Sequence, residues 1–318
     1  MPDPSSSDLI LHHYATSPFS EKVRLMLGYK GLAWRSVTVP IINPKPDVIA
    51  LTGGYRKTPF MQVGADIYCD TALIAQLLET RAPQPSLYPA DAPLAPQLAQ
   101  WADSTLFWTM IPYVMQPAGA AAIFAGTPPE VLKAFAADRA GFTTGMRRRT
   151  LADATVQLKA ALASLNAQLG AQQAIGRPGL LGASLSIADF SVAHCLWFIR
   201  RAAPVAGILA AYPQAGRLLD QVLELGHGHK QAFDSTQAMA LAAAATAHAT
   251  TTVVPGQGFD AGAAVTVSAT DYGMDPVAGT LVGLTDDEVV IRRADERAGI
   301  LHVHFPRAGF QIKPEKTA

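Results

Sequence analysis

The turn from an apolar stretch into an amphipathic helix near the N-terminus constrains the fold more than any other feature of the chain. Residues 9–11 are apolar and predict a short buried strand, and residues 17–24, SPFSEKVR, predict a helix directly after it. Ser17 suits the N-cap, and Pro18 suits the first helical turn, where a missing N–H has no consequence. The N-terminus of such a helix favours negative charge. The pattern therefore predicts either a simple cap at Ser17 or an anion-binding site.

Two later motifs favour the binding site. Residues 56–63, RKTPFMQV, place Pro59 at the entrance of an apolar strand, where proline is tolerated only at a first position, an edge or a bulge. Residues 69–74, CDTALI, begin another helix with Asp70 and Thr71, which suit either capping or the charged end of a ligand.

In this order the motifs resemble the glutathione transferase family, and SPFSEKVR is most similar to the serine-type tau and zeta classes. The resemblance implies that Ser17 donates a hydrogen bond to the thiolate of bound glutathione and does not itself attack the substrate. A cysteine-type thiol has a pKa of about 8.5, and lowering that pKa by two units needs about 2.7 kcal/mol. One hydroxyl donor and a helix N-terminus can supply that stabilisation.

The resemblance also implies which residues bind the rest of glutathione: Lys45, Lys57, Thr58, Pro59, Asp70 and Thr71. The family's proline follows a cis peptide bond, so the backbone of Thr58 would pair with the cysteinyl part. Asp70 would hold the γ-glutamyl ammonium group and Thr71 the γ-glutamyl carboxylate, and either lysine could reach the glycyl carboxylate. The family usually has Glu-Ser in place of Asp70-Thr71, so the acid here is one methylene shorter.

The chain divides into three expected domains. Residues 1–90 alternate strands and helices, which predicts a thioredoxin-like α/β domain, and a proline-rich linker follows. Residues 91–249 have helical spacing and predict an all-helical domain with a hydrophobic co-substrate pocket, as the family has. Phe19, Trp108 and Tyr113 are expected to face that pocket. Asp189, in SIADF, is expected to close a capping box and to have no catalytic role.

Residues 250–318 are unlike ordinary family members, which end before them. Short, partly alternating segments at 265–267, 279–283, 289–293, 300–305 and 310–312 predict a small β-meander or barrel, expected to dock on the helical domain. His302 and His304 share one strand face, and His227 and His229 flank a glycine. Because no third ligand lies within sequence reach, we expect no metal site.

Composition excludes several classes of function. The 25 basic and 25 acidic residues give a net charge of zero, so neither a nucleic-acid footprint nor attraction to a membrane surface is indicated. Two cysteines cannot form a disulfide framework and suit a reducing compartment. The polar N-terminus does not have the pattern of a secretory signal. These features predict a cytoplasmic protein.

Together, these observations predict a glutathione transferase-like enzyme in which the glutathione thiol attacks an apolar, electrophilic small molecule. Family members pair through their first two domains, which implies a homodimer. The alternative is a non-catalytic binding or regulatory protein that keeps the fold. Thiol–disulfide exchange is disfavoured because it prefers a cysteine at position 17.

Overall fold

The N-terminal motif folds as a strand, a turn and a helix in the computed structural model, which describes residues 8–315. Residues 8–81 contain four strands in the order β4-β3-β1-β2, with β2 parallel to β1 and the β3–β4 hairpin antiparallel. This is the thioredoxin-like arrangement. Its elements are β1 (Ile10–His13), α1 (Pro18–Tyr29), β2 (Ala33–Thr38), α2 (Pro46–Thr52), β3 (Phe60–Val63), β4 (Asp66–Cys69) and α3 (Thr71–Arg81).

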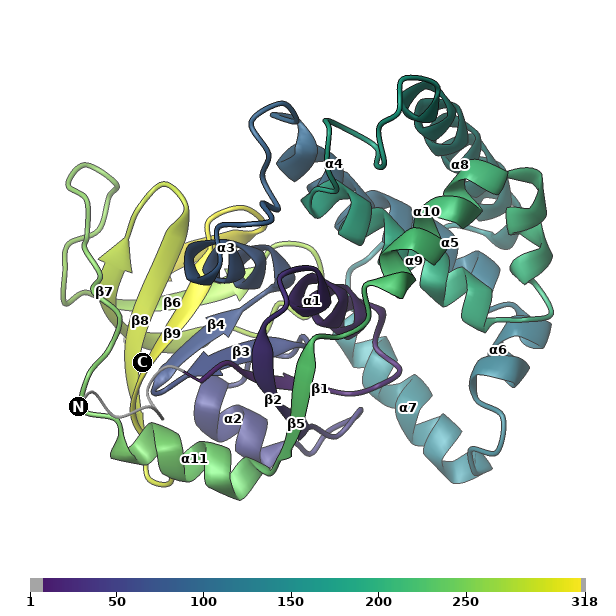
Figure 1. Cartoon of the computed structure of the whole chain (residues 1–318). Helices are drawn as coiled ribbons and strands as arrows, with labels where there is room; N and C mark the ends of the chain where they lie inside the picture. Colours follow the sequence, from purple (N-terminus) through teal and green to yellow (C-terminus); the bar gives the residue numbers. More distant parts are fainter. Residues whose placement is uncertain (1–7, 316–318) are drawn as a thin grey trace.

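A helical domain follows the proline-rich linker, as predicted, and packs beside α1 (Figure 1). A π-helical segment, Ala102–Leu106, interrupts its first long helix. Its other helices are α4 (Ala95–Trp101), α5 (Phe107–Val114), α6 (Pro117–Ile123), α7 (Pro129–Phe142), α8 (Leu151–Ala174), α9 (Ile187–Arg201), the 3-10 helix Ala206–Ala211 and α10 (Pro213–Glu224). At the start of α9, Ser186 and Asp189 form the predicted capping box.

The prediction that the chain stays helical as far as residue 249 is wrong. Strand β5 (His229–Phe233) pairs in parallel with β2, and α11 (Ser235–Ala244) then packs against the N-terminal sheet. Gly228 makes this return possible: its φ is 67°, and a Cβ there would lie 2.6 Å from the carbonyl oxygen of Leu32. The helical domain therefore ends near α10, and the next segment rejoins the first domain.

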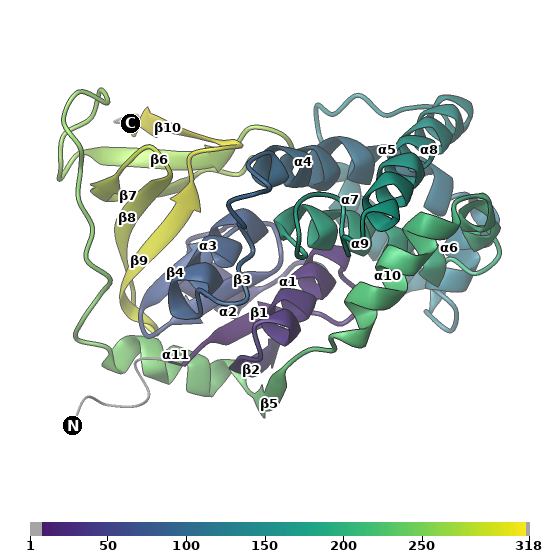
Figure 2. The same cartoon turned by 45° about the horizontal axis from the view of Figure 1, so that its top comes forward.

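The C-terminal residues form the predicted meander, but they do not form a separate body docked on the helices. Strand β9 pairs in parallel with β4, so one sheet of ten strands runs β10-β6-β7-β8-β9-β4-β3-β1-β2-β5 (Figures 1 and 2). The sheet is open, with β10 and β5 at its edges. The added elements are β6 (Ala264–Ala269), β7 (Val277–Leu284), β8 (Glu288–Asp295), β9 (Gly299–Pro306) and β10 (Phe310–Pro314).

Residues 8–315 contain two large hydrophobic cores and a small third cluster of Ile10, Val37 and Ala238. One joins α1 and α3 to the helical domain. The other large core is shared between the first domain and strands β6–β10, the part of the sheet that we call the C-terminal sheet. It includes the fully buried Phe60, Ile67, Ile291 and Phe305. Since residues from both parts fill this core, the C-terminal sheet depends on the first domain for much of its burial.

Two further observations bear on the compositional predictions. Cys69 and Cys195 are both buried and form no disulfide. No helix within residues 8–315 combines the length and the apolar character needed to cross a membrane.

Candidate functional site

Ser17 occupies the N-cap of α1, as predicted. Its Oγ accepts a hydrogen bond from the backbone N–H of Ser20 at 3.1 Å, which leaves the hydroxyl hydrogen able to donate elsewhere. Ser17 is 2% exposed. The hydroxyl therefore lies at the N-terminus of α1, the positive end of the helix dipole, but beneath the molecular surface.

Asp70 stands out in backbone conformation. Among the non-glycine residues that the structure describes, it alone has a positive φ, at 78° with ψ 142°. It is the N-cap of α3, where its Oδ1 accepts the N–H of Ala72 at 2.9 Å. Burial raises the pKa of Asp70, while Lys57 opposes that shift. Asp70 is partly exposed, and the next residue, Thr71, begins the helix and is buried.

A buried charge network lies behind Thr71, and sequence reasoning missed it. The ammonium group of Lys22, in α1, donates to Thr71 Oγ1 at 3.2 Å and to Asp103 Oδ2 at 2.5 Å. His194 Nε2 lies 2.9 Å from the other oxygen of Asp103. Burial alone would raise the pKa of Asp103, but Lys22 and then His194 outweigh it and lower the pKa to about 2. Asp103 sits in the π-helical segment, a kind of irregularity that often marks a functional site.

Asp70, Thr71 and Asp103 line a small cavity that the C-terminal segments close, whereas Ser17, Lys22 and His194 do not line it. Its volume is about 40 Å³, and residues of all three parts of the chain line it: Phe19, Lys57, Asp70, Thr71, Gln100, Asp103, Ser104, Asp271, Tyr272, Ala308, Gly309 and Phe310. Space of that size admits water but no tripeptide. The structure thus brings together four of the predicted residues, Phe19, Lys57, Asp70 and Thr71. Residues 271–272 and 308–310 from the C-terminal part of the chain complete the cavity wall, and we call them the lid.

The lid is attached to the site through Lys57. Its ammonium group donates to Asp271 Oδ1 at 2.7 Å and lies 4.1 Å from the centroid of the Tyr272 ring. Tyr272 in turn packs edge-on against Trp108 of α5, with ring centroids 4.8 Å apart, and against Phe142 of α7. The loop between β6 and β7 therefore reaches the helical domain, although β6 and β7 themselves belong to the ten-stranded sheet.

The remaining predicted residues are placed as follows. Thr58 precedes Pro59 in a cis peptide bond, as the family resemblance implies, and its buried Oγ1 has no hydrogen-bond partner among the described residues. Phe19 packs on Phe107, with ring centroids 4.7 Å apart. Tyr113 does not line the cavity, because its hydroxyl donates to the carbonyl of Val205 at 3.1 Å.

Lys45 does not line the cavity either. Burial, together with the nearby Arg139, lowers its pKa to about 8. Of the two lysines considered for the glycyl carboxylate, Lys57 is the one at the cavity wall.

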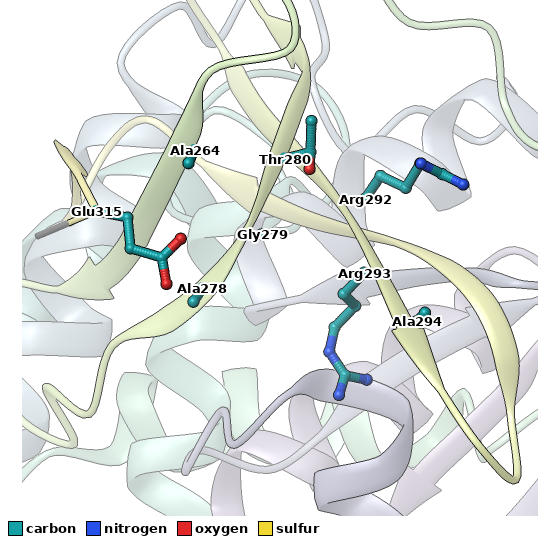
Figure 3. Close-up of a pocket in the computed structure, with 8 residues that line it drawn as sticks. All are labelled: Ala264, Ala278, Gly279, Thr280, Arg292, Arg293, Ala294 and Glu315. Atoms are coloured by element: carbon teal, nitrogen blue, oxygen red, sulfur yellow. The ribbon is translucent and has the colours of Figure 1, made fainter. Parts of the chain in front are cut away.

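A larger hollow, of about 380 Å³, lies on the C-terminal sheet over β6, β7 and β8 (Figure 3). None of the predicted site residues lines it. Arg293 is one of the residues that line the hollow, and its guanidinium donates to the carbonyl of Ala50 in α2. Arg293 therefore ties the sheet to α2, and the hollow is separate from the candidate site.

The chain is similar to known proteins in sequence and in fold. Residues 11–86 match the family described as Glutathione S-transferase, N-terminal domain, and residues 133–220 match Glutathione S-transferase, C-terminal domain. The chain is 40% identical to a GST-like protein from Pseudomonas syringae with TM-score 0.78, and the match covers 97% of this chain and 100% of that one. The chain belongs to the glutathione S-transferase family.

Other members share the fold over a shorter span. A glutathione S-transferase from Rhodospirillum rubrum F11 is 20% identical with TM-score 0.50, and the match covers 68% of this chain and 87% of that one. Glutathione S-transferase III in its apo form is 20% identical with TM-score 0.51, and the match covers 68% of this chain and 92% of that one. No curated protein sequence matches. The full-length likeness to the Pseudomonas syringae protein therefore extends into the C-terminal sheet, whereas the other two leave about a third of this chain unmatched.

Proposed function

We propose that this family member binds glutathione at the cavity beside Asp70 and activates its thiol for attack on an apolar, electrophilic small molecule. The observation that carries the proposal is the backbone of Asp70. Positive φ at a non-glycine residue is unfavourable and persists where the surroundings enforce it, which is common at ligand sites. Here it occurs at a helix N-terminus, on a cavity wall, at the position that the family resemblance assigns to the γ-glutamyl group.

The charges around the cavity suit the two ends of glutathione. The carboxylate of Asp70 would bind the γ-glutamyl ammonium group. Thr71 would donate to the γ-glutamyl carboxylate, because its oxygen already accepts from Lys22 and its hydrogen remains available. The positive charge of Lys22 and the N-terminus of α3 add to that attraction. Lys57 would bind the glycyl carboxylate.

Thiol activation would fall to Ser17. Its oxygen is occupied by the N–H of Ser20, so the hydroxyl hydrogen can be donated to a thiolate. The dipole of α1 adds further stabilisation of negative charge at the same end of the helix. The remaining backbone contact, to the cysteinyl part, would come from Thr58.

Binding requires the lid to move. A tripeptide needs roughly 300 Å³ or more, far above the space beneath Asp271, Tyr272 and Phe310. We infer that the glycyl carboxylate replaces that of Asp271 on Lys57 as the lid opens. One carboxylate then substitutes for the other, so the charge of Lys57 stays paired throughout.

The closed cavity also supports the second candidate, a non-catalytic protein that keeps the fold. Two measurements on the full chain separate the two functions: calorimetric titration with reduced glutathione, and conjugation of a nitro-activated aryl chloride. Glutathione binding with turnover above the uncatalysed rate supports the enzyme. Binding without turnover supports the non-catalytic alternative. Absence of binding contradicts the proposed glutathione site and is compatible only with the non-catalytic alternative.

Family membership further supports a homodimer and, with the buried unpaired cysteines, a cytoplasmic location. Light scattering at micromolar concentration tests the dimer. A monomer would contradict it, and would indicate that contacts of the C-terminal sheet within the chain replace those of a partner.

A further inference from the structure

Three acid and imidazole side chains meet where the C-terminal sheet joins the first domain. Asp66 is the first residue of β4, His302 lies opposite it in β9, and His248 lies in the segment after α11. Asp66 Oδ1 is 3.9 Å from His248 Nδ1 and 3.9 Å from His302 Nδ1. One ligand atom from each residue lies within 4.8 Å of the other two.

Both of these imidazole nitrogens lack partners. His248 Nδ1 and His302 Nδ1 are buried, and neither has a hydrogen-bond partner within residues 8–315. The two rings stack with centroids 3.9 Å apart. Buried polar atoms are nearly always satisfied, so two unpaired nitrogens beside one carboxylate need an explanation.

A second set of contacts holds Asp66 in place. Its Oδ2 accepts the N–H of Ala249 at 2.9 Å, and its Oδ1 accepts from His304 Nε2 at 2.8 Å. The other nitrogen of His304 lies 2.7 Å from Glu288 Oε1. Outer hydrogen bonds of this kind orient ligating carboxylates at metal sites.

We propose that Asp66, His248 and His302 bind a divalent transition-metal ion, with zinc the favoured one. Two imidazoles and one carboxylate form a ligand set that zinc prefers, and a water molecule would complete four-coordination. Zn–N and Zn–O distances near 2.1 Å put tetrahedral ligand atoms about 3.4 Å apart. The two separations of 3.9 Å between the Asp66 carboxylate and the imidazole nitrogens would each need to shorten by about half an ångström. The His248 and His302 side chains are 19% and 13% exposed, which leaves a route for the ion to enter.

The site would be structural. Its ligands come from β4, from β9 and from the segment that connects α11 to the C-terminal sheet, so one ion would fasten all three at the junction. None of the three lines the candidate glutathione cavity. The metal proposal therefore stands or fails independently of the proposed function.

The test uses the full chain, stripped of metal with a chelator and titrated with Zn²⁺ alone. We expect one ion per chain and, at saturation, a rise in melting temperature of roughly 5 °C. Co²⁺ in place of Zn²⁺ should give visible absorption bands typical of nitrogen and oxygen ligands. His248→Ala and His302→Ala should each weaken Zn²⁺ binding by about a hundredfold or more and abolish the rise in melting temperature.

Asp66 is a poorer position for the test, because its substitution would also release His304 and Ala249. The matched control is His229→Ala, which removes an exposed histidine of β5 and should bind Zn²⁺ like the wild type. Failure of the wild-type chain to bind one Zn²⁺ at micromolar concentration would overturn the proposal. Unchanged binding in both His248→Ala and His302→Ala would also overturn it.

Discussion

Lys57 of the first domain donates to Asp271 of the C-terminal sheet across 2.7 Å, although the two residues are 214 positions apart. Their contact closes the cavity at the lysine that, under the proposed function, would bind the glycyl carboxylate of glutathione. The carboxylate of Asp271 thus occupies the position on Lys57 that the glycyl carboxylate of glutathione would take. The C-terminal sheet, absent from ordinary family members, would then take part in regulating access to the site.

Replacement of that internal carboxylate should favour the ligand. Asp271→Asn removes the charge but keeps the oxygen that accepts the N–H of Tyr272. Because partly exposed ion pairs contribute at most about 1 kcal/mol, we expect glutathione to bind roughly two- to fivefold tighter. Isothermal titration calorimetry measures the change. Asp275→Asn, whose carboxylate is half exposed and 3.9 Å from Arg56, is the control and should bind normally. Weaker or unchanged binding by Asp271→Asn would show that the two carboxylates do not compete.

Loss of the Ser17 hydroxyl should affect the thiol more than the affinity. In Ser17→Ala the bound thiolate loses a hydrogen-bond donor, so the pKa of the glutathione thiol should rise by more than about one unit. The conjugation rate at neutral pH should fall accordingly. Ultraviolet absorbance of the thiolate against pH measures the shift. Loss of the N-cap should also destabilise the chain by about 1 kcal/mol.

Two variants separate the hydroxyl from other effects of the substitution. Ser17→Thr keeps both the cap and the donor and should keep most activity. Ser20→Ala removes a nearby buried hydroxyl that has no hydrogen-bond partner among the described residues, and its pH profile should match the wild type. An unchanged pH profile in Ser17→Ala would assign activation to the helix terminus alone.

The network around Asp103 predicts how the free energy of unfolding depends on pH. The pKa of Asp103 is about 2 in the folded chain, below its ordinary 3.8, so ionised Asp103 favours the folded state. That contribution, about 2 kcal/mol, is complete above pH 4 and is lost as the pH falls toward 2. Denaturant unfolding at pH 5 and pH 3 should therefore show a smaller loss of stability in Asp103→Asn than in the wild type.

At neutral pH the same variant should be less stable by about 3 kcal/mol or more, because the buried ammonium group of Lys22 loses its partner. Asp260→Asn, at an exposed position, is the control and should behave like the wild type at both pH values. Equal acid sensitivity in Asp103→Asn and the wild type would contradict the assigned pKa.

Removal of residues 251–318 should damage the first domain. The truncation would expose the edge of β4 and one side of the core around Phe60 and Ile67. An unpaired strand edge beside exposed apolar surface favours aggregation. We expect an insoluble or poorly folded product, which circular dichroism and size-exclusion chromatography would detect. A soluble, cooperatively folded product would mean that the C-terminal sheet is dispensable for stability.

Local patterns predicted the parts of this molecule that depend on neighbours in sequence. The cap at Ser17, the capping box at Asp189 and the five C-terminal strands follow from turn chemistry and alternation within a few residues. Strand β5 was missed because four of its five residues are exposed, so it has no apolar alternation. Its pairing with β2 depends on the close approach of Gly228 to Leu32.

Contacts between distant segments account for the other differences. The parallel pairing of β9 with β4 joins positions more than 230 residues apart, and no local signal specifies it. Lys22, Asp103 and His194 each read as ordinary helical residues, and only packing of α1, the π-helical segment and α9 brings them together. The lid residue Asp271 likewise lies in a turn whose partner, Lys57, belongs to another domain.

The central claim is that glutathione binds through Asp70, and Asp70→Asn tests it most directly. Asparagine tolerates positive φ and can keep the bond to Ala72, so the substitution removes the charge with little change in backbone. In calorimetric titrations, the wild type should bind reduced glutathione, and Asp70→Asn should bind it about tenfold or more weakly, a loss of 1 to 3 kcal/mol. Equal affinity in the two proteins, or no binding by the wild type, would contradict the account.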